Sequence, residues 1–146
     1  QGFCIPKSRG SLIKYKKGLK KLTILDESYN SNPLSLKFAL QRFNLINIKT
    51  SKKYLLIGDM LELGAYSKKL HIEIAKYINK SKVNKTYAYG RHTKHTFNKL
   101  KPQIRGRILT NTMDIYNLIN KVLPNNSLLM VKGSNSTGLN KIIQKL

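Results

Sequence analysis

Acidic side chains are scarce in this 146-residue chain, which holds 6 aspartates and glutamates against 28 lysines and arginines. The formal net charge is therefore +22, a balance compatible with binding to nucleic acid or to an anionic membrane surface. Only 5 of the basic residues are arginines, and they form no stripe interleaved with aromatic residues. Lysines scattered over solvated faces therefore explain the charge better, and we expect no nucleic acid partner.

Cysteine occurs once, at Cys4, and tryptophan is absent. A single thiol excludes a disulfide framework and a Cys-x-x-Cys metal site, and it is compatible with a reducing, cytoplasmic compartment. His92 and His95 have no cysteine or acid near them in sequence, so we expect no metal site. No apolar run approaches 18 residues, so we predict no membrane span. The chain begins at Gln1 and not at Met, and we interpret it as a piece of a longer protein.

Apolar segments, each followed by a polar turn and an amphipathic helix, organise the chain from residue 22 onward. This alternation predicts one α/β domain, with a mostly parallel sheet that is covered by helices on both faces. An additional strand around Leu12–Tyr15 is expected to pair with the first of these strands across a Lys17-Gly18 turn. The predicted strands are 22–26, 53–57, 85–89, 107–110 and 127–131; the predicted helices are 33–45, 68–80 with a Ser67 cap, 92–100, 113–122 after Asn111, and a last one from Leu139.

The carboxyl ends of parallel strands share one edge of the sheet, and ligands bind beyond that edge in folds of this kind. The polar turns at 26–32, 58–64, 90–92, 110–112 and 132–136 should therefore meet at one rim. Four of the six acids lie in the first two of these turns. This clustering in a basic chain predicts a local role for them.

The first of these turns begins at Asp26, directly after a short buried strand. Asp26 can accept hydrogen bonds from vicinal hydroxyls, as a strand-end acid does with a ribose. Asn30 and Asn32 can both donate and accept. The structural alternative is helix capping by Asn32, with Pro33 in the first turn. For Tyr29 we expect a packing role and not a catalytic one.

A second turn places Asp59 and Glu62 between Gly58 and Gly64, which permit tight turns. These acids could attract an ammonium group or orient a basic residue. The structural alternative is a loop with salt bridges to lysines.

A third turn, Lys132-Gly133-Ser134-Asn135-Ser136, follows a strand and opens a helix. Backbone N–H groups there, together with Lys132, could hold a carboxylate or phosphate. The turn does not follow the pattern of a Walker A loop. Helix capping by Ser136 or Thr137 is the structural alternative.

In combination, these motifs resemble the C-terminal domain of the Mur ligases, most closely the MurF type. The family pattern D-D/E-S-Y-N-A-N-P is similar to residues 26–33, with Ser31 in place of the usual Ala. The pattern G-D-M-x-E-L-G, followed by Ser and His, is similar to residues 58–64, Ser67 and His71. The pattern V-K-G-S-x-S is similar to residues 131–136. Arg9-Gly10 lies where the family has a linker arginine.

The resemblance implies a Rossmann-like domain, with residues 1–12 as linker and first strand region and residues 13–146 as the C-terminal domain. The central ATPase domain and the N-terminal UDP-sugar domain of the family are absent. The full enzyme would use ATP and Mg²⁺ to join D-alanyl-D-alanine to UDP-N-acetylmuramoyl-tripeptide for peptidoglycan. This chain alone would hold no catalytic residue and no metal, and would be inactive.

The resemblance also implies roles for individual residues. Arg9, Asp26 and Asn30 would bind the nucleotide. Asn32, Lys132, Ser134 and Ser136 would bind the incoming substrate. Asp59 and Glu62 are signature positions without an implied contact. A sister ligase of the folylpolyglutamate synthase or MurE type, and a basic α/β nucleic-acid-binding module, remain the alternatives.

Overall fold

The computed structural model describes residues 10–46 and 52–146, whose strands form one six-stranded sheet in the order β1-β2-β6-β3-β4-β5. β1 and β2 pair antiparallel around the Lys17-Gly18 turn, and all other neighbouring strands pair parallel. The predicted α/β class, the mostly parallel sheet and the first hairpin are confirmed. The strands are β1 (Ser11–Lys17), β2 (Lys20–Glu27), β3 (Lys53–Gly58), β4 (Lys85–Tyr89), β5 (Arg105–Leu109) and β6 (Ser127–Lys132).

The first helix has the bounds that its sequence predicts. The Asn32 side chain accepts a hydrogen bond from the Ser35 backbone N–H at 2.8 Å, and the Ser35 hydroxyl accepts one from the Asn32 N–H at 3.0 Å. This reciprocal cap, with Pro33 behind it, fixes where the helix begins. The helices are α1 (Pro33–Leu45), α2 (Ser67–Glu73), α3 (Ala75–Asn79), α4 (Thr93–Phe97), α5 (Thr112–Asn117) and α6 (Leu139–Gln144); shorter turns are η1 (Gly64–Tyr66), η2 (Pro102–Ile104), the π-helical η3 (Leu118–Val122) and η4 (Asn135–Thr137).

The helix predicted over 68–80 is interrupted at Ile74, between α2 and α3. There the Thr96 hydroxyl donates to the carbonyl of His71, the acceptor that a regular helix would use for the N–H four residues later. The predicted Ser67 cap is wrong, because Ser67 is already helical and Tyr66 precedes the helix without a side-chain capping bond. The helix predicted over 113–122 ends as the π-helical turn η3.

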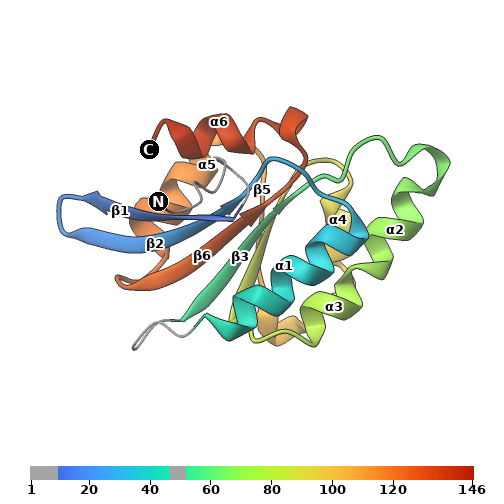
Figure 1. Cartoon of the computed structure of the whole chain (residues 1–146), viewed down its shortest axis with the longest axis horizontal. Helices are drawn as coiled ribbons and strands as arrows, with labels where there is room; N and C mark the ends of the chain where they lie inside the picture. The colour runs from blue at the N-terminus through green and yellow to red at the C-terminus, as the bar shows by residue number, and fades with distance from the viewer. Residues whose placement is uncertain (1–9, 47–51) are drawn as a thin grey trace, which may run out of the picture.

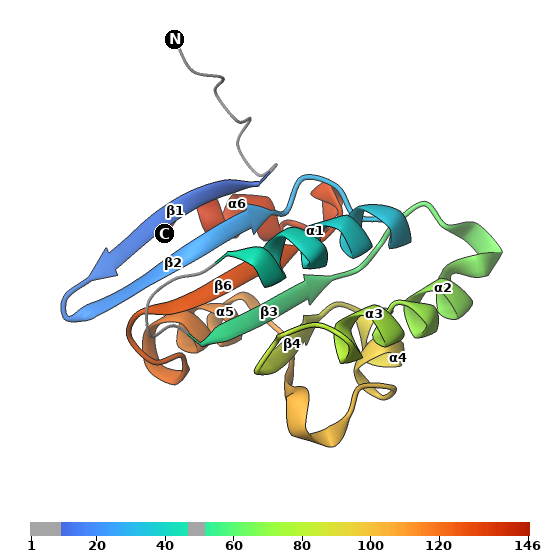
Figure 2. The ribbon, with the colours of Figure 1, turned by 60° about the horizontal axis from the view of Figure 1, so that its bottom comes forward.

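Helices cover both faces of the sheet, as predicted (Figure 1). Successive strand residues point to opposite faces, so one strand contributes to two apolar layers. In β2, Ile24 packs in the layer with α5 and α6, whereas Leu25 packs in the layer with α1 and α3. Figure 2 shows β1 at the open edge of the sheet, beside β2.

The five parallel strands run in one direction, so their carboxyl ends lie at one edge of the sheet, where the turns after β2, β3 and β6 follow. None of the described helices combines the length and apolar character that a bilayer crossing would require.

Candidate functional site

Ser134 joins the three motif turns into one rim. Its backbone N–H donates to the Asp59 carbonyl at 3.1 Å, and its hydroxyl accepts from the Leu61 N–H at 2.9 Å. The same hydroxyl lies 3.4 Å from the Ser31 carbonyl, to which it donates. These bonds link the turn after β6 to the turns after β3 and β2. The prediction that the acid-bearing turns and the last glycine turn share one rim is confirmed.

Two neighbouring pockets open along this rim and share Leu61 and Ser136 in their walls. The larger, of about 490 Å³, lies beyond β3, β4 and β5, and the smaller, of about 270 Å³, lies between the three motif turns. The larger is lined by Asp59, Leu61, Tyr89, Gly90, Arg91, Ile108, Leu109, Thr110, Ser136 and Thr137. The smaller is lined by Tyr29, Asn30, Leu61, Glu62, Ser134, Asn135 and Ser136.

The two described residues with a predicted nucleotide role line different pockets. Asp26 is only 1% exposed, and its carboxylate accepts from the backbone N–H of Ser28 at 3.1 Å and from the Ser28 hydroxyl. It contributes to a third pocket, of about 450 Å³, between β1 and α6, which Lys14 and Lys16 also line. Asn30 is exposed and lines the smaller rim pocket. Arg9, the third predicted nucleotide ligand, lies outside the described residues.

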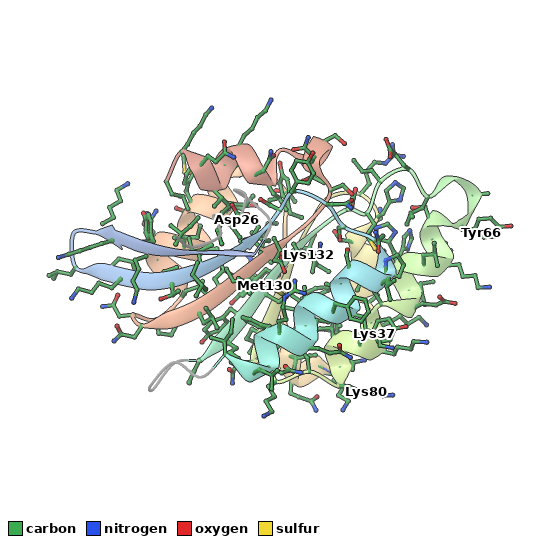
Figure 3. The ribbon with its side chains drawn as sticks, in the orientation of Figure 1. Asp26, Lys37, Tyr66, Lys80, Met130 and Lys132 are labelled. Carbon is green, nitrogen blue, oxygen red and sulfur yellow. The ribbon has the colours of Figure 1, made fainter. Side chains whose placement is uncertain are left out.

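Lys132 of β6 pairs with Glu27 of the neighbouring strand β2, the residue after Asp26 (Figure 3). Its side chain is buried in a cluster of charged groups. It is 4% exposed, and its ammonium group donates to the Asn30 carbonyl. Burial lowers the pKa of Lys132 to about 8, opposed by the nearby Glu27 carboxylate and reinforced by Arg42. Glu27 itself forms an ion pair with Arg42 of α1. Lys132 therefore holds the turn after β2, and its predicted contact with a substrate carboxylate stays a prediction.

Asp59, a signature acid without an implied contact, caps helix α4. One carboxylate oxygen accepts from the backbone N–H groups of His92 at 2.9 Å and Thr93 at 3.0 Å. These are orphan donors at a helix N-terminus, where a carboxylate also meets the positive end of the helix dipole. Gly90, with φ +129°, leaves room for this contact, because a Cβ there would lie 2.5 Å from the Asp59 Oδ1 atom. The predicted alternative of lysine salt bridges is wrong for Asp59, since the one ion pair among the described residues is Arg42–Glu27.

His71 holds the same turn from α2. Its ring is fully buried, with Nε2 accepting from the Met60 N–H at 3.0 Å and Nδ1 lying 2.7 Å from the Ser67 carbonyl. The Nδ1 atom must therefore carry the proton, so this arrangement requires a neutral imidazole. Burial lowers the pKa of His71, with the Ser67 carbonyl and Asp59 opposing and the neighbouring His92 and His95 reinforcing that shift. The sequence motif includes His71 but predicts no contact for it.

Several exposed groups remain on the rim after these internal contacts. Glu62 is exposed, has φ +64° and lines the smaller pocket. Ser136 is exposed and lines both pockets, whereas the Asn32 side chain is used to cap α1. Tyr29 is 41% exposed at the smaller pocket, and the packing role expected for it stays a prediction.

The structure adds residues that the sequence prediction missed, namely Tyr89, Arg91, Ile108 and Thr110 around the larger pocket. The turns at 90–92 and 110–112 were predicted to reach the rim, but no motif gave their side chains a role. Across residues 10–46 and 52–146, no three histidine, cysteine or acidic side chains come together as a metal site would require.

A parallel α/β sheet with its polar turns joined at the carboxyl edge defines a ligand-binding domain of the Rossmann-like kind. The chain belongs to the Mur ligase family: the model of the family described as "Mur ligase, glutamate ligase domain" matches residues 9–135. Membership in this family does not favour the nucleic-acid-binding alternative.

The chain is similar to several ligases of this family in sequence and in structure. The chain is 30% identical over 141 residues to the UDP-N-acetylmuramoyl-tripeptide–D-alanyl-D-alanine ligase of Rickettsia prowazekii, covering 97% of this chain and 30% of that protein. A MurF structure from Acinetobacter baumannii superimposes with a TM-score of 0.77 at 22% identity, over 97% of this chain and 30% of that one. The MurF ligase of Thermotoga maritima, solved with ADP, gives 0.75 at 18% identity, over 95% and 30%. The chain therefore spans about a third of the length of these proteins.

Proposed function

We propose that this chain is the C-terminal domain of an ATP-dependent ligase that joins D-alanyl-D-alanine to UDP-N-acetylmuramoyl-tripeptide in peptidoglycan precursor synthesis. The observation that carries the proposal is a match over 97% of the chain to a relative that bears this name. The joined rim supports it, because it brings the three motif turns together at the ligand-binding edge. The remaining domains of the ligase would lie outside these residues, and the enzyme would work in the cytoplasm, where ATP is available.

ATP, held with Mg²⁺ mainly by a central domain, would supply the phosphoryl group that activates the tripeptide carboxyl as an acyl phosphate. The dipeptide amine would then attack that carbonyl and release phosphate. The present chain would close over this reaction and exclude water, which otherwise hydrolyses the acyl phosphate.

Within this chain, Asp26 fits the hydroxyl groups of a nucleotide. Its carboxylate lies at a strand end and borders a pocket of about 450 Å³ whose lysines, Lys14 and Lys16, would complement phosphate charge. Asn30 is exposed at the smaller rim pocket and would contact the nucleotide. Ser136 is exposed at both rim pockets and would contact the dipeptide. Lys132, Ser134 and Asn32 would position these turns through the bonds described above.

The test is the amino-substrate dependence of ADP release by the full-length ligase that contains this chain. Purified enzyme is given ATP and Mg²⁺ with either UDP-N-acetylmuramoyl-tripeptide and D-alanyl-D-alanine, or a single amino acid such as D-glutamate or meso-diaminopimelate together with the UDP-linked acceptor of its own ligase. We expect release only with the dipeptide. Release that depends on a single amino acid and its own acceptor would identify a sister ligase and refute the proposal. The 146-residue chain by itself should release no ADP.

A further inference from the structure

The larger rim pocket has a charged and an apolar side. Arg91 lies two residues after the end of β4 and brings the cation of the pocket lining. Ile108 and Leu109 of β5 and Tyr89 of β4 add apolar lining. Asp59 is the acid of this pocket, but two backbone N–H groups of α4 bind one of its carboxylate oxygens. The pocket therefore offers its cation next to an acid whose charge the helix terminus partly compensates.

The guanidinium group of Arg91 is well placed to meet a ligand. Arg91 is exposed, and the ion pair found in residues 10–46 and 52–146 joins Arg42 to Glu27, not Arg91 to Asp59. A guanidinium presents its N–H donors as a planar fork that matches a carboxylate. Lys132, the cation that the motif suggests for this task, is instead buried on the Asn30 carbonyl.

We propose that Arg91 binds the carboxylate of the incoming dipeptide in the larger rim pocket, a role that rests on the proposed function. The apolar wall formed by Leu61, Ile108 and Leu109 receives an alanyl methyl group. Because the two pockets share Leu61 and Ser136, the rest of the dipeptide can extend along the rim toward the turn that carries Asn30. The pocket thus selects a short ligand that carries a carboxylate and a methyl group.

The experiment compares D-alanyl-D-alanine with its C-terminal amide in the full-length ligase. Arg91→Ala should raise the KM for the dipeptide about 10- to 100-fold, the loss expected for a hydrogen bond to a charged group. The KM values for ATP and for the UDP-linked tripeptide should stay unchanged. The wild-type enzyme should prefer the dipeptide over the amide, and Arg91→Ala should remove most of that preference. Arg91→Lys should restore part of it, because an ammonium keeps the charge but not the fork.

Arg107→Ala is the matched control, since Arg107 is an exposed arginine of β5 that does not line the pocket. It removes the same charge and should leave the KM for the dipeptide and the preference over the amide unchanged. Arg91→Gln, which keeps a polar end, replaces Arg91→Ala in the comparison if the melting temperature of the alanine variant falls.

Two negative results are distinguishable. An Arg91 variant with the wild-type KM for the dipeptide, or with the full preference over the amide, would overturn the inference while dipeptide-dependent turnover still stands. A wild-type enzyme without dipeptide-dependent turnover would refute the proposed function itself.

Discussion

Replacing Asp59 with alanine should lower the free energy of unfolding of this domain, because the change removes the shared acceptor of two backbone N–H groups. The Thr93 residue is fully buried, so water cannot replace the lost bond, and an unsatisfied buried donor costs about 1–3 kcal/mol. The His92 N–H is only partly buried, so the loss there is closer to that of an exposed helix cap, about 1 kcal/mol. Together these terms predict a destabilisation of about 2–4 kcal/mol.

Asp59→Asn should cost less, because the amide oxygen can still accept both hydrogen bonds. The change removes the interaction between the carboxylate and the helix dipole, which is worth about 0.3–1 kcal/mol. Glu62→Ala is the control: Glu62 is an exposed acid in the same turn, and removing such a side chain typically changes stability by less than about 0.5 kcal/mol.

The assay is urea-induced unfolding of the 146-residue chain, followed by circular dichroism, with the free energy of unfolding taken from midpoint and slope. We expect stability to decrease in the order wild type, Asp59→Asn, Asp59→Ala, with Glu62→Ala beside the wild type. A destabilisation by Asp59→Ala below about 0.5 kcal/mol, within the range of ordinary surface changes, would refute the capping role.

Two further predictions concern pH. Burial lowers the pKa of His71, so the unfolded chain binds a proton there at a higher pH than the folded chain does. The free energy of unfolding should therefore be highest above pH 6.5 and should decline as the pH falls from 6.5 toward the lowered pKa. In urea titrations His71→Gln should flatten that decline, whereas a double His92→Gln, His95→Gln variant should keep it; equal slopes in all three proteins would contradict the prediction. The pKa of Lys132 is about 8 in the folded chain, against 10.5 as its ordinary value. The free energy of unfolding should therefore rise with pH between about 8 and 10.5, where the unfolded chain holds a proton that the folded chain has lost. For a shift of this size the rise amounts to about 3 kcal/mol, and Lys132→Met should abolish it. If the variant keeps the rise, the buried ammonium group is not the source of the pH dependence.

The order of strands and helices could be predicted from the sequence because each apolar segment was bounded by residues with a clear local role. Asn32 and Pro33 fixed the start of α1, and Asn111 caps α5 as its position suggested. The errors lie where a distant side chain intervenes. The interruption at Ile74 coincides with a hydrogen bond from Thr96, and no local pattern in 68–80 encodes that partner.

The rim was predictable as a location and less so as a set of contacts. A parallel sheet brings polar turns to one edge whatever their sequence, so residues 26–32, 58–64 and 132–136 could be placed together in advance. Which side chains point inward depends on packing between turns. Asp59 was therefore open to several roles until its partners on α4 were known, and Arg91 had no motif to mark it.

The side chains on this rim divide by what they contact, and the division predicts how variants behave. Asp59, His71 and Ser134 bond to the backbone of neighbouring turns, so their loss should move the whole rim. Such variants should have a lower melting temperature and a higher KM for every substrate. The exposed groups, Asn30, Glu62, Arg91 and Ser136, bond little within the domain, so their loss should raise the KM of one substrate and leave the melting temperature unchanged. The motifs that define this family thus reflect, in large part, how the rim is held in place, and the groups proposed to contact substrate lie beside the motifs as well as within them.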